Sequence, residues 1–175
     1  PQTMAFSLGI VLEIPSFRIA ILGRMQAALP GLDVPAPPGL PEEAPYPPVQ
    51  LNLDVVGIID IPNERLSIDA SLYDSRVMQW TIKGDMALRA KWGETSQFLV
   101  SLGGFHPAYS PPENVPDLER LTVALDIPGG VPKITYKGYL AVTSNTFQVG
   151  AGVHAAIEKG ELSISGRLRF DALFE

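Results

Sequence analysis

The chain has 175 residues, 46% of them hydrophobic and 18% charged, a composition typical of one folded domain with a core of its own. Its net charge of −6 argues against nucleic acid as a partner, because neutralising phosphates requires clustered lysine and arginine side chains. The absence of cysteine excludes disulfide frameworks, thiolate metal sites and cysteine nucleophiles.

The sequence does not specify a compartment. No run of about 18 apolar residues predicts a transmembrane helix, and no basic-then-apolar leader is visible. The chain starts at Pro1 and stops at Glu175, directly after a strand-like segment. We therefore expect residues 1–175 to form a single domain excised from a larger protein.

The first fifty residues predict two strands and a long proline-rich loop. Every second residue of 6–14 is apolar, which is the period-2 pattern of a strand. Residues 17–29 continue the alternation, although the helix formers in 23–29 make a helix the competing interpretation. Residues 30–50 hold eight prolines, which exclude a helix or a strand interior. We expect these residues to form a stiff, extended segment over the sheet, and the alternative is a ligand for aromatic-lined grooves.

The remainder of the chain predicts eight further strands. Apolar and polar residues alternate in 51–61, 66–72, 80–92, 98–102, 121–127, 134–142, 147–157 and 162–170. Most connections have the length of a hairpin turn, and a second proline-rich loop covers 106–118. Because the connections are too short for crossover helices and the strands have one apolar face, we expect antiparallel pairing. The sequence thus predicts an all-β fold, an antiparallel meander of about ten strands.

Glycines recur on the apolar face of this predicted sheet. Gly57, Gly84, Gly138 and Gly166 each occupy a mid-strand position there. Glycine inside a strand indicates a bend or a close approach of another backbone. We therefore expect a strongly curved sheet whose concave apolar face forms the core. Such a sheet is barrel-like, folds into a sandwich, or stays open as a gutter.

Several blocks of the chain resemble a known family. They are LSIDASLYDSR, GDMALRAKWG, FLVSLGGFHPAY, GYLAVTSNTFQVGAG and FDALF, and together they lie within residues 51–175. The blocks resemble an uncharacterised domain found in very large β-rich bacterial proteins. The resemblance implies a module of a larger bacterial protein, and it supplies no catalytic residues.

The two histidines do not predict a metal site. A metal needs at least three converging ligands, and no local spacing of histidine and carboxylates supplies them. His106 lies between a glycine pair and a proline, and His154 lies on the polar face of a strand. We expect His106 to hold its loop through a hydrogen bond, with a ligand or base role as the alternative. No metal or other cofactor is predicted.

No constellation of catalytic residues stands out. Ser101 lacks the G-x-S-x-G context of a nucleophile elbow, and neither glycine pair precedes a helix pattern that would make a phosphate loop. Five aspartates recur on or near the polar face, where two of them could form a glycosidase pair: Asp54, Asp60, Asp69, Asp74 and Asp85. We expect them instead to form ion pairs across the strands of a solvated face. The sequence therefore predicts no enzyme.

The apolar face supplies the remaining candidate site. Its large side chains would contact an apolar ligand, and they are Trp80, Met86, Trp92, Phe98, Phe147 and Phe170. Trp80 and Trp92 lie near the two ends of one strand, which is also the aromatic pattern of a membrane β-barrel.

Three functions are therefore open. The first is a non-enzymatic structural module whose edge strands pair with neighbouring β segments of the same or another chain. The second is a β domain that binds a lipid or another apolar small molecule on its concave face. The third is a membrane β-barrel pore.

Overall fold

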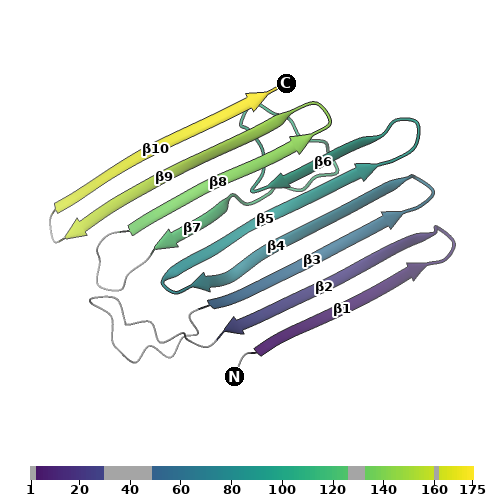
Figure 1. Ribbon diagram of the computed structural model, residues 1–175, viewed down its shortest axis with the longest axis horizontal. Coiled ribbons are helices and arrows are strands. Elements are labelled where there is room, and N and C mark those ends of the chain that lie inside the picture. Colours follow the sequence, from purple (N-terminus) through teal and green to yellow (C-terminus); the bar gives the residue numbers. More distant parts are fainter. Residues whose placement is uncertain (1–2, 30–48, 126–132, 160–161) are drawn as a thin grey trace.

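A computed structural model describes residues 3–29, 49–125, 133–159 and 162–175. Within these ranges the chain forms one sheet of ten antiparallel strands (Figure 1). The strands are β1 (Thr3–Glu13), β2 (Arg18–Leu29), β3 (Val49–Asp60), β4 (Arg65–Val77), β5 (Trp80–Lys91), β6 (Gln97–Leu102), β7 (Leu121–Leu125), β8 (Lys133–Thr143), β9 (Phe147–Lys159) and β10 (Leu162–Phe174). The predicted all-β meander is confirmed, while the proline-rich segment 30–48 lies outside the described residues.

The strands follow each other in the sheet almost in chain order. The order is β1-β2-β3-β4-β5-β6-β8-β9-β10, and β7 pairs with both β5 and β8. The short strands β6 and β7 therefore lie end to end in one row, which the longer β5 and β8 flank (Figure 1). Residues 17–29 are strand and not helix, because β2 pairs along its length with β1 and β3.

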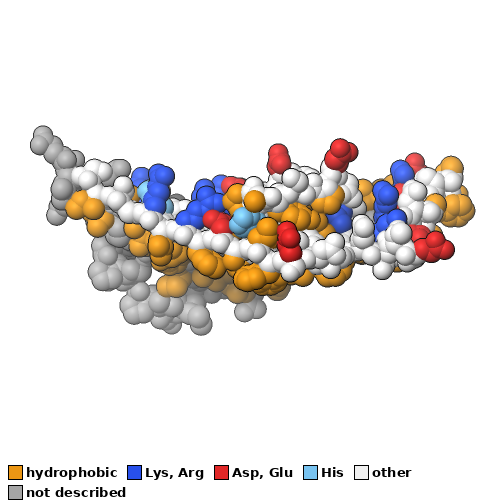
Figure 2. Space-filling view, turned by 90° about the horizontal axis from the view of Figure 1, so that it is seen from above, with side chains coloured by type: hydrophobic (Ala, Val, Ile, Leu, Met, Phe, Trp, Pro, Cys, Tyr) orange, Lys and Arg blue, Asp and Glu red, His pale blue; other side chains and the backbone are white. Residues whose placement is uncertain are grey.

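The sheet is open. Neither of its edge strands, β1 and β10, pairs with the other in the described structure, so the barrel-like alternative is not formed. Seen from its edge, the described part is a thin slab with hydrophobic side chains on one side and charged ones projecting from the other (Figure 2). We call these sides the apolar face and the polar face.

Between β6 and β7 the chain leaves the sheet and covers part of the polar face. We call residues 103–120 the strap. Phe105 and Val115 of the strap form a buried cluster with sheet residues Ala87, Leu99 and Ala141. The sheet residues of this cluster point to the polar face, since Ala87 and Ala141 both pair with Ser101. The expectation that the apolar face forms the core is therefore wrong for the described residues.

The two ends of the strap are fastened at one aspartate of β5. The Asp85 backbone carbonyl accepts a hydrogen bond from the Gly103 N–H (2.7 Å), and the Asp85 N–H donates to the Glu119 carbonyl (3.1 Å). Asp85 Oδ2 also accepts from the Glu119 N–H (2.8 Å), and Oδ1 accepts from the hydroxyl of Ser71 (2.7 Å). Gly103, with a φ of 72°, makes the turn out of β6 that most side chains disfavour.

No described segment forms a second layer over the apolar face. Phe6 in β1 is 69% exposed and Leu168 in β10 is 74% exposed. Even toward the middle of the sheet, Phe98 and Phe147 keep 49% and 44% of their surface in contact with solvent. Full burial of such a side chain contributes about 1.5–3 kcal/mol, so an uncovered face leaves much of this free energy unrealised.

The apolar-face glycines fall into two groups. A Cβ on Gly84 would lie 2.8 Å from the Leu121 Cα, and one on Gly138 would lie 3.3 Å from the Gly150 carbonyl oxygen. These two glycines mark close approaches of backbone, as predicted. A Cβ on Gly57 would make only ordinary contacts, and one on Gly166 would meet nothing within 4 Å. For these two positions packing does not require glycine.

Candidate functional site

The six predicted apolar-face residues form a broad surface and do not converge on a pocket. They belong to β5, β6, β9 and β10, and Trp92 follows directly after β5. Trp80 lies beside Tyr136, with ring centroids 6.0 Å apart, and Phe147 lies beside Phe174 at 6.1 Å. Met86 is partly buried, whereas Phe170 is 60% exposed. Such a surface offers area to an apolar partner but no groups that would orient a specific ligand.

His106 lies in the strap and holds its local conformation. Its Nδ1 accepts a hydrogen bond from the Ala108 N–H (3.1 Å), and its carbonyl accepts from the Tyr109 N–H (2.9 Å). Its own N–H donates to Oε1 of Gln148 in β9 (2.9 Å). Gln148 is fully buried, so this bond ties the strap to the sheet. These contacts fit the expected loop-holding role.

The polar face carries a hollow of about 680 Å³ over β8, β9 and β10. The register arranges its central residues in three rows across these strands. Thr135, His154 and Arg167 form one row, Lys137, Gly152 and Arg169 the next, and Tyr139, Gly150 and Asp171 the third. Register partners on antiparallel strands point to the same face, so Gly152 leaves an open floor between its flanking side chains, whereas the Tyr139 ring lies over Gly150. We call this hollow the basic trough.

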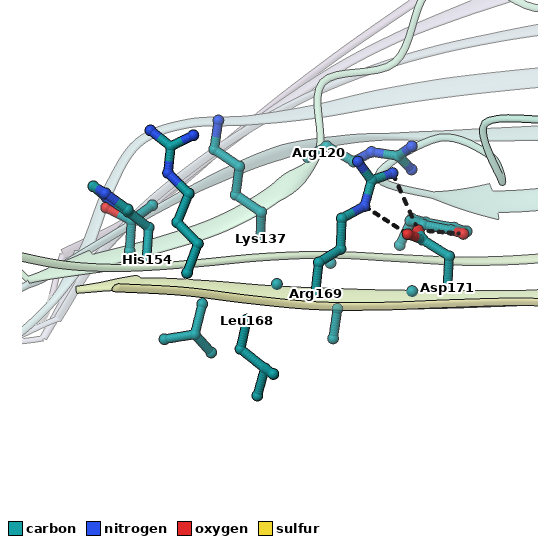
Figure 3. Close-up of a pocket in the computed structure, with 14 residues that line it drawn as sticks. Arg120, Lys137, His154, Leu168, Arg169 and Asp171 are labelled. Atoms are coloured by element: carbon teal, nitrogen blue, oxygen red, sulfur yellow. Dashed lines mark hydrogen bonds and ion pairs between the residues drawn. The ribbon is translucent and has the colours of Figure 1, made fainter. Parts of the chain in front are cut away.

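Figure 3 shows that the charged side chains of the trough lie on one side of the strands. Lys137, His154 and Arg169 extend to one side of the strands, and Leu168 extends to the other. Four of the fourteen lining residues are arginine or lysine, whereas Asp171 is the single acidic one. In a chain whose net charge is −6, this is a local reversal of sign.

Asp171 is fully engaged at one end of the trough. Its Oδ2 accepts a hydrogen bond from Arg169 Nε (2.5 Å), and its Oδ1 accepts one from the Tyr139 hydroxyl (2.9 Å). The Arg169 hydrogen bond holds the pKa of the Asp171 carboxyl below its ordinary value. Burial, together with the hydrogen bond to Asp171, raises the pKa of Tyr139 to about 12. Tyr139 is therefore a neutral donor over the physiological pH range.

Arg120 closes the same end of the trough from the strap. Its guanidinium lies 4.0 Å from the centroid of the Tyr139 ring and donates to the carbonyls of Gly103 (2.9 Å) and Phe105 (2.6 Å). Burial lowers the pKa of this guanidinium from its ordinary value. Arg120 thus fastens the strap and covers the one aromatic ring that lines the trough.

Three other groups in the trough make no hydrogen bond or ion pair with any described residue. They are Lys137 of β8, His154 of β9 and Arg167 of β10. The pattern that brings them together was visible in the sequence, because all three occupy polar positions of two consecutive hairpins. It becomes a site only when the register places them in adjacent rows around Gly152.

Three of the five polar-face aspartates form the predicted ion pairs across strands. Arg24 contacts Asp54 (2.7 Å), Arg18 contacts Asp60 (2.9 Å) and Arg89 contacts Asp69 (2.8 Å). A hydrogen bond from Arg24 lowers the pKa of Asp54, and one from Asn63 lowers that of Asp60. The arrangement is that of a solvated, charge-paired surface.

The described residues offer neither a cluster of metal ligands nor a membrane-spanning helix. In those ranges no group of three or more histidine, cysteine or carboxylate side chains could hold a metal ion. No described helix is long and apolar enough to cross a membrane.

Comparison with known proteins identifies the family but not an activity. No curated protein and no solved structure matches the chain. A family of unknown function, DUF6603, matches residues 2–175. The match extends through the N-terminal region, where the sequence blocks alone showed no resemblance. The chain therefore belongs to the DUF6603 family, which has no assigned function.

Proposed function

We propose that this domain is a non-enzymatic structural module of a larger bacterial protein, extended at its edges by neighbouring β segments. The observation that carries the proposal is the pair of long, regular edge strands whose outer sides pair with no other described strand. β1 has 11 residues and β10 has 13, and each pairs with its inner neighbour without a register shift. Such edges present rows of free backbone donors and acceptors, which a further strand can pair with.

The residues beside β1 support this interpretation. Val11, Leu22, Val56 and Ile58 lie on the polar face of β1–β3, and each is more than 40% exposed. The apolar face of the same strands is exposed as well. Exposed apolar side chains therefore lie on both faces of this region, between the Arg18–Asp60 and Arg24–Asp54 ion pairs of the polar face. The β1 side of the domain therefore has the composition of an interface.

The absence of cysteine makes a direct cross-linking test simple. Ser7 of β1 and Ser165 of β10 both lie at exposed polar-face positions of the edge strands. Ser7→Cys and Ser165→Cys proteins would be mixed and treated with a short bismaleimide. Edge pairing predicts a cross-linked β1–β10 dimer, because adjacent strands lie about 4.8 Å apart.

The matched control is Ser67→Cys in β4, which lies on the same face but within the sheet. It should give no cross-linked species when mixed with either edge variant. A protein that stays monomeric at all concentrations, or one in which Ser67→Cys cross-links as well as the edge variants, would contradict the proposal.

A second function is favoured by the uncovered apolar face. A sheet surface that exposes Phe6, Phe98, Phe170 and Leu168 could hold an apolar small molecule or lipid. Native mass spectrometry and lipid extraction, after purification without detergent, would test this function. Co-purifying lipid that is lost on Leu168→Ser would support it, with Ser165→Ala on the polar face as the control. If the protein is free of lipid and its edges cross-link, the structural module is the one function that remains.

A further inference from the structure

We propose that the basic trough binds a compact phosphoryl anion, centred above Gly152. This inference goes beyond the structural function, since it concerns the polar face of β8, β9 and β10 and not the edges of the sheet.

The geometry places cationic and polar groups on three sides of Gly152. Lys137 and Arg169 are its register partners on β8 and β10, and His154 follows two residues further along β9. Arg167 lies next to His154 on β10. Adjacent strands are about 4.8 Å apart, and every second residue of a strand is about 6.7 Å further on. An anion above Gly152 therefore lies within the reach of all four side chains.

Gly152 itself has no structural requirement for glycine. Its φ is not positive, and an added Cβ would come no closer than 3.5 Å to the Leu168 carbonyl oxygen. Glycine weakens a strand interior, and an unneeded glycine there often marks the close approach of a ligand. The neighbouring Gly150 is different, because a Cβ at that position would clash with the Tyr139 ring. Packing thus explains Gly150, and the open floor of the trough explains Gly152.

The charges select the class of ligand. Lys137 and Arg167 have no described partner, and Arg169 shares Asp171 with Tyr139. Several cations that converge on one position suit a multivalent anion better than a single carboxylate. Planar guanidinium groups also match the oxygens of a phosphoryl group. The Tyr139 ring is not free to stack on a nucleobase, since Arg120 covers it. The chemistry therefore points to a diphosphate, a phosphorylated small molecule or a phospholipid headgroup.

The test uses inorganic diphosphate as the probe, measured by isothermal titration calorimetry at low ionic strength. The wild-type domain should bind it, and chemical shifts of the His154 ring should move on binding. A second arm uses phosphatidylcholine vesicles with and without phosphatidic acid. Binding to diphosphate alone identifies a soluble ligand, whereas binding that requires phosphatidic acid in the vesicles identifies a headgroup. Either result supports the site, and the absence of both would overturn the proposal.

Two matched pairs of variants separate the trough from unspecific charge. Gly152→Leu fills the floor, and Gly166→Leu makes the same exchange on the apolar face, where a Cβ meets nothing within 4 Å. Lys137→Gln removes a trough cation, and Lys91→Gln makes the same change near the far end of β5. Lys137→Gln should weaken binding about tenfold or more, the effect of losing one charge-assisted hydrogen bond. Gly152→Leu should weaken it at least as much, because the leucine side chain would occupy the position of the anion. Folded Gly152→Leu protein that binds diphosphate as tightly as the wild type would also overturn the proposal.

Discussion

The strap-covered centre and the two edge hairpins are built from the same alternating strands, but among the described residues a second layer covers the centre alone. Ala87 and Ala141, under the strap, have no exposed surface, and Phe105 above them is 9% exposed. In β1 and β10 the large apolar side chains stay 57–74% exposed wherever they point to the apolar face, as with Phe6 and Leu168. A strand residue in a single layer is screened only by its neighbours in the sheet.

This difference shows where the stability of the domain resides. In the centre, tertiary packing adds to the hydrogen-bonded ladder, whereas the β1–β2 and β9–β10 hairpins rely on the ladder and on whatever covers them. The outer hairpins are thus the part of the domain best suited to contacts with other segments.

The sharpest test of the comparison exchanges one phenylalanine in each region. Phe105→Ala removes a buried ring from the cluster under the strap and should lower the free energy of unfolding by about 3–5 kcal/mol. Phe6→Ala removes an exposed ring of β1 and should cost less than about 1 kcal/mol. Urea denaturation followed by tryptophan fluorescence measures both. Equal losses would show that β1 is covered in solution.

Two glycines give a second contrast. Gly84→Val would force a side chain against the Leu121 backbone, where β7 begins, and should cost about 3 kcal/mol. Gly166→Val enters open space in the edge strand β10 and should change the free energy of unfolding by less than about 0.5 kcal/mol. Melting temperatures of both variants test this, and an unchanged value for Gly84→Val would contradict the close approach.

The buried side chain of Gln148 and the exposed side chain of Gln97 allow the strap contact to be compared with a surface position. Gln148→Ala removes the acceptor for the His106 N–H and the donor to Thr146 Oγ1 (2.9 Å), which should cost about 2 kcal/mol. Gln97→Ala makes the same exchange at an exposed position of β6 and should be nearly neutral. Hydrogen exchange at the His106 amide should accelerate in Gln148→Ala alone. Similar rates in both variants would show that this bond does not hold the strap.

The smallest effect appears only at high pH. The folded-state pKa of Tyr139, raised to about 12, exceeds its ordinary value of about 10, so the unfolded chain loses this proton first. The stabilisation is complete below pH 10 and is lost as the pH rises from about 10 to 12. Denaturation midpoints at pH 9 and pH 11 should fall less in Tyr139→Phe than in the wild type. If the midpoint falls equally in the variant and the wild type, groups other than Tyr139 cause the loss of stability at high pH.

Much of the fold followed from local patterns. Period-2 alternation predicted every strand of the sheet, since it needs only one solvated and one apolar side. The glycine pair before His106 lies where the chain leaves β6, with Gly103 and Gly104 both at positive φ. The strand ends were less accurate, because Ser75 and Asp74 interrupt the alternation of β4.

That interruption is a β-bulge whose cause is not local. The register between β4 and β5 shifts between Leu72 and Ser75, and Asp74 has a φ of 43°. The Asn52 N–H donates to Ser75 Oγ (2.9 Å), and Asn52 Nδ2 donates to the Asp74 carbonyl (2.9 Å). These partners are more than twenty residues apart, so propensity within β4 does not reveal them.

The basic trough likewise combines a local pattern, visible in the sequence, with contacts between distant strands. His154 was correctly placed on a polar face, but its neighbours could not be named from its own strand. Lys137 and Arg167 are separated from it by 17 and 13 positions in the sequence, and only the hairpin register makes them adjacent. The hollow also depends on Gly152, whose missing side chain gives no signal in a hydropathy pattern.

The sequence by itself determined the class of the fold, the succession of antiparallel strands and the separation into two faces. These properties depend on the pleat and on short turns, which act over a few residues. Only the tertiary structure decided that the strap covers the polar face, that β6 and β7 share one row and that cations surround Gly152. Those outcomes depend on contacts between segments far apart in the chain, where steric fit and hydrogen bonding select one arrangement among several with the same alternation.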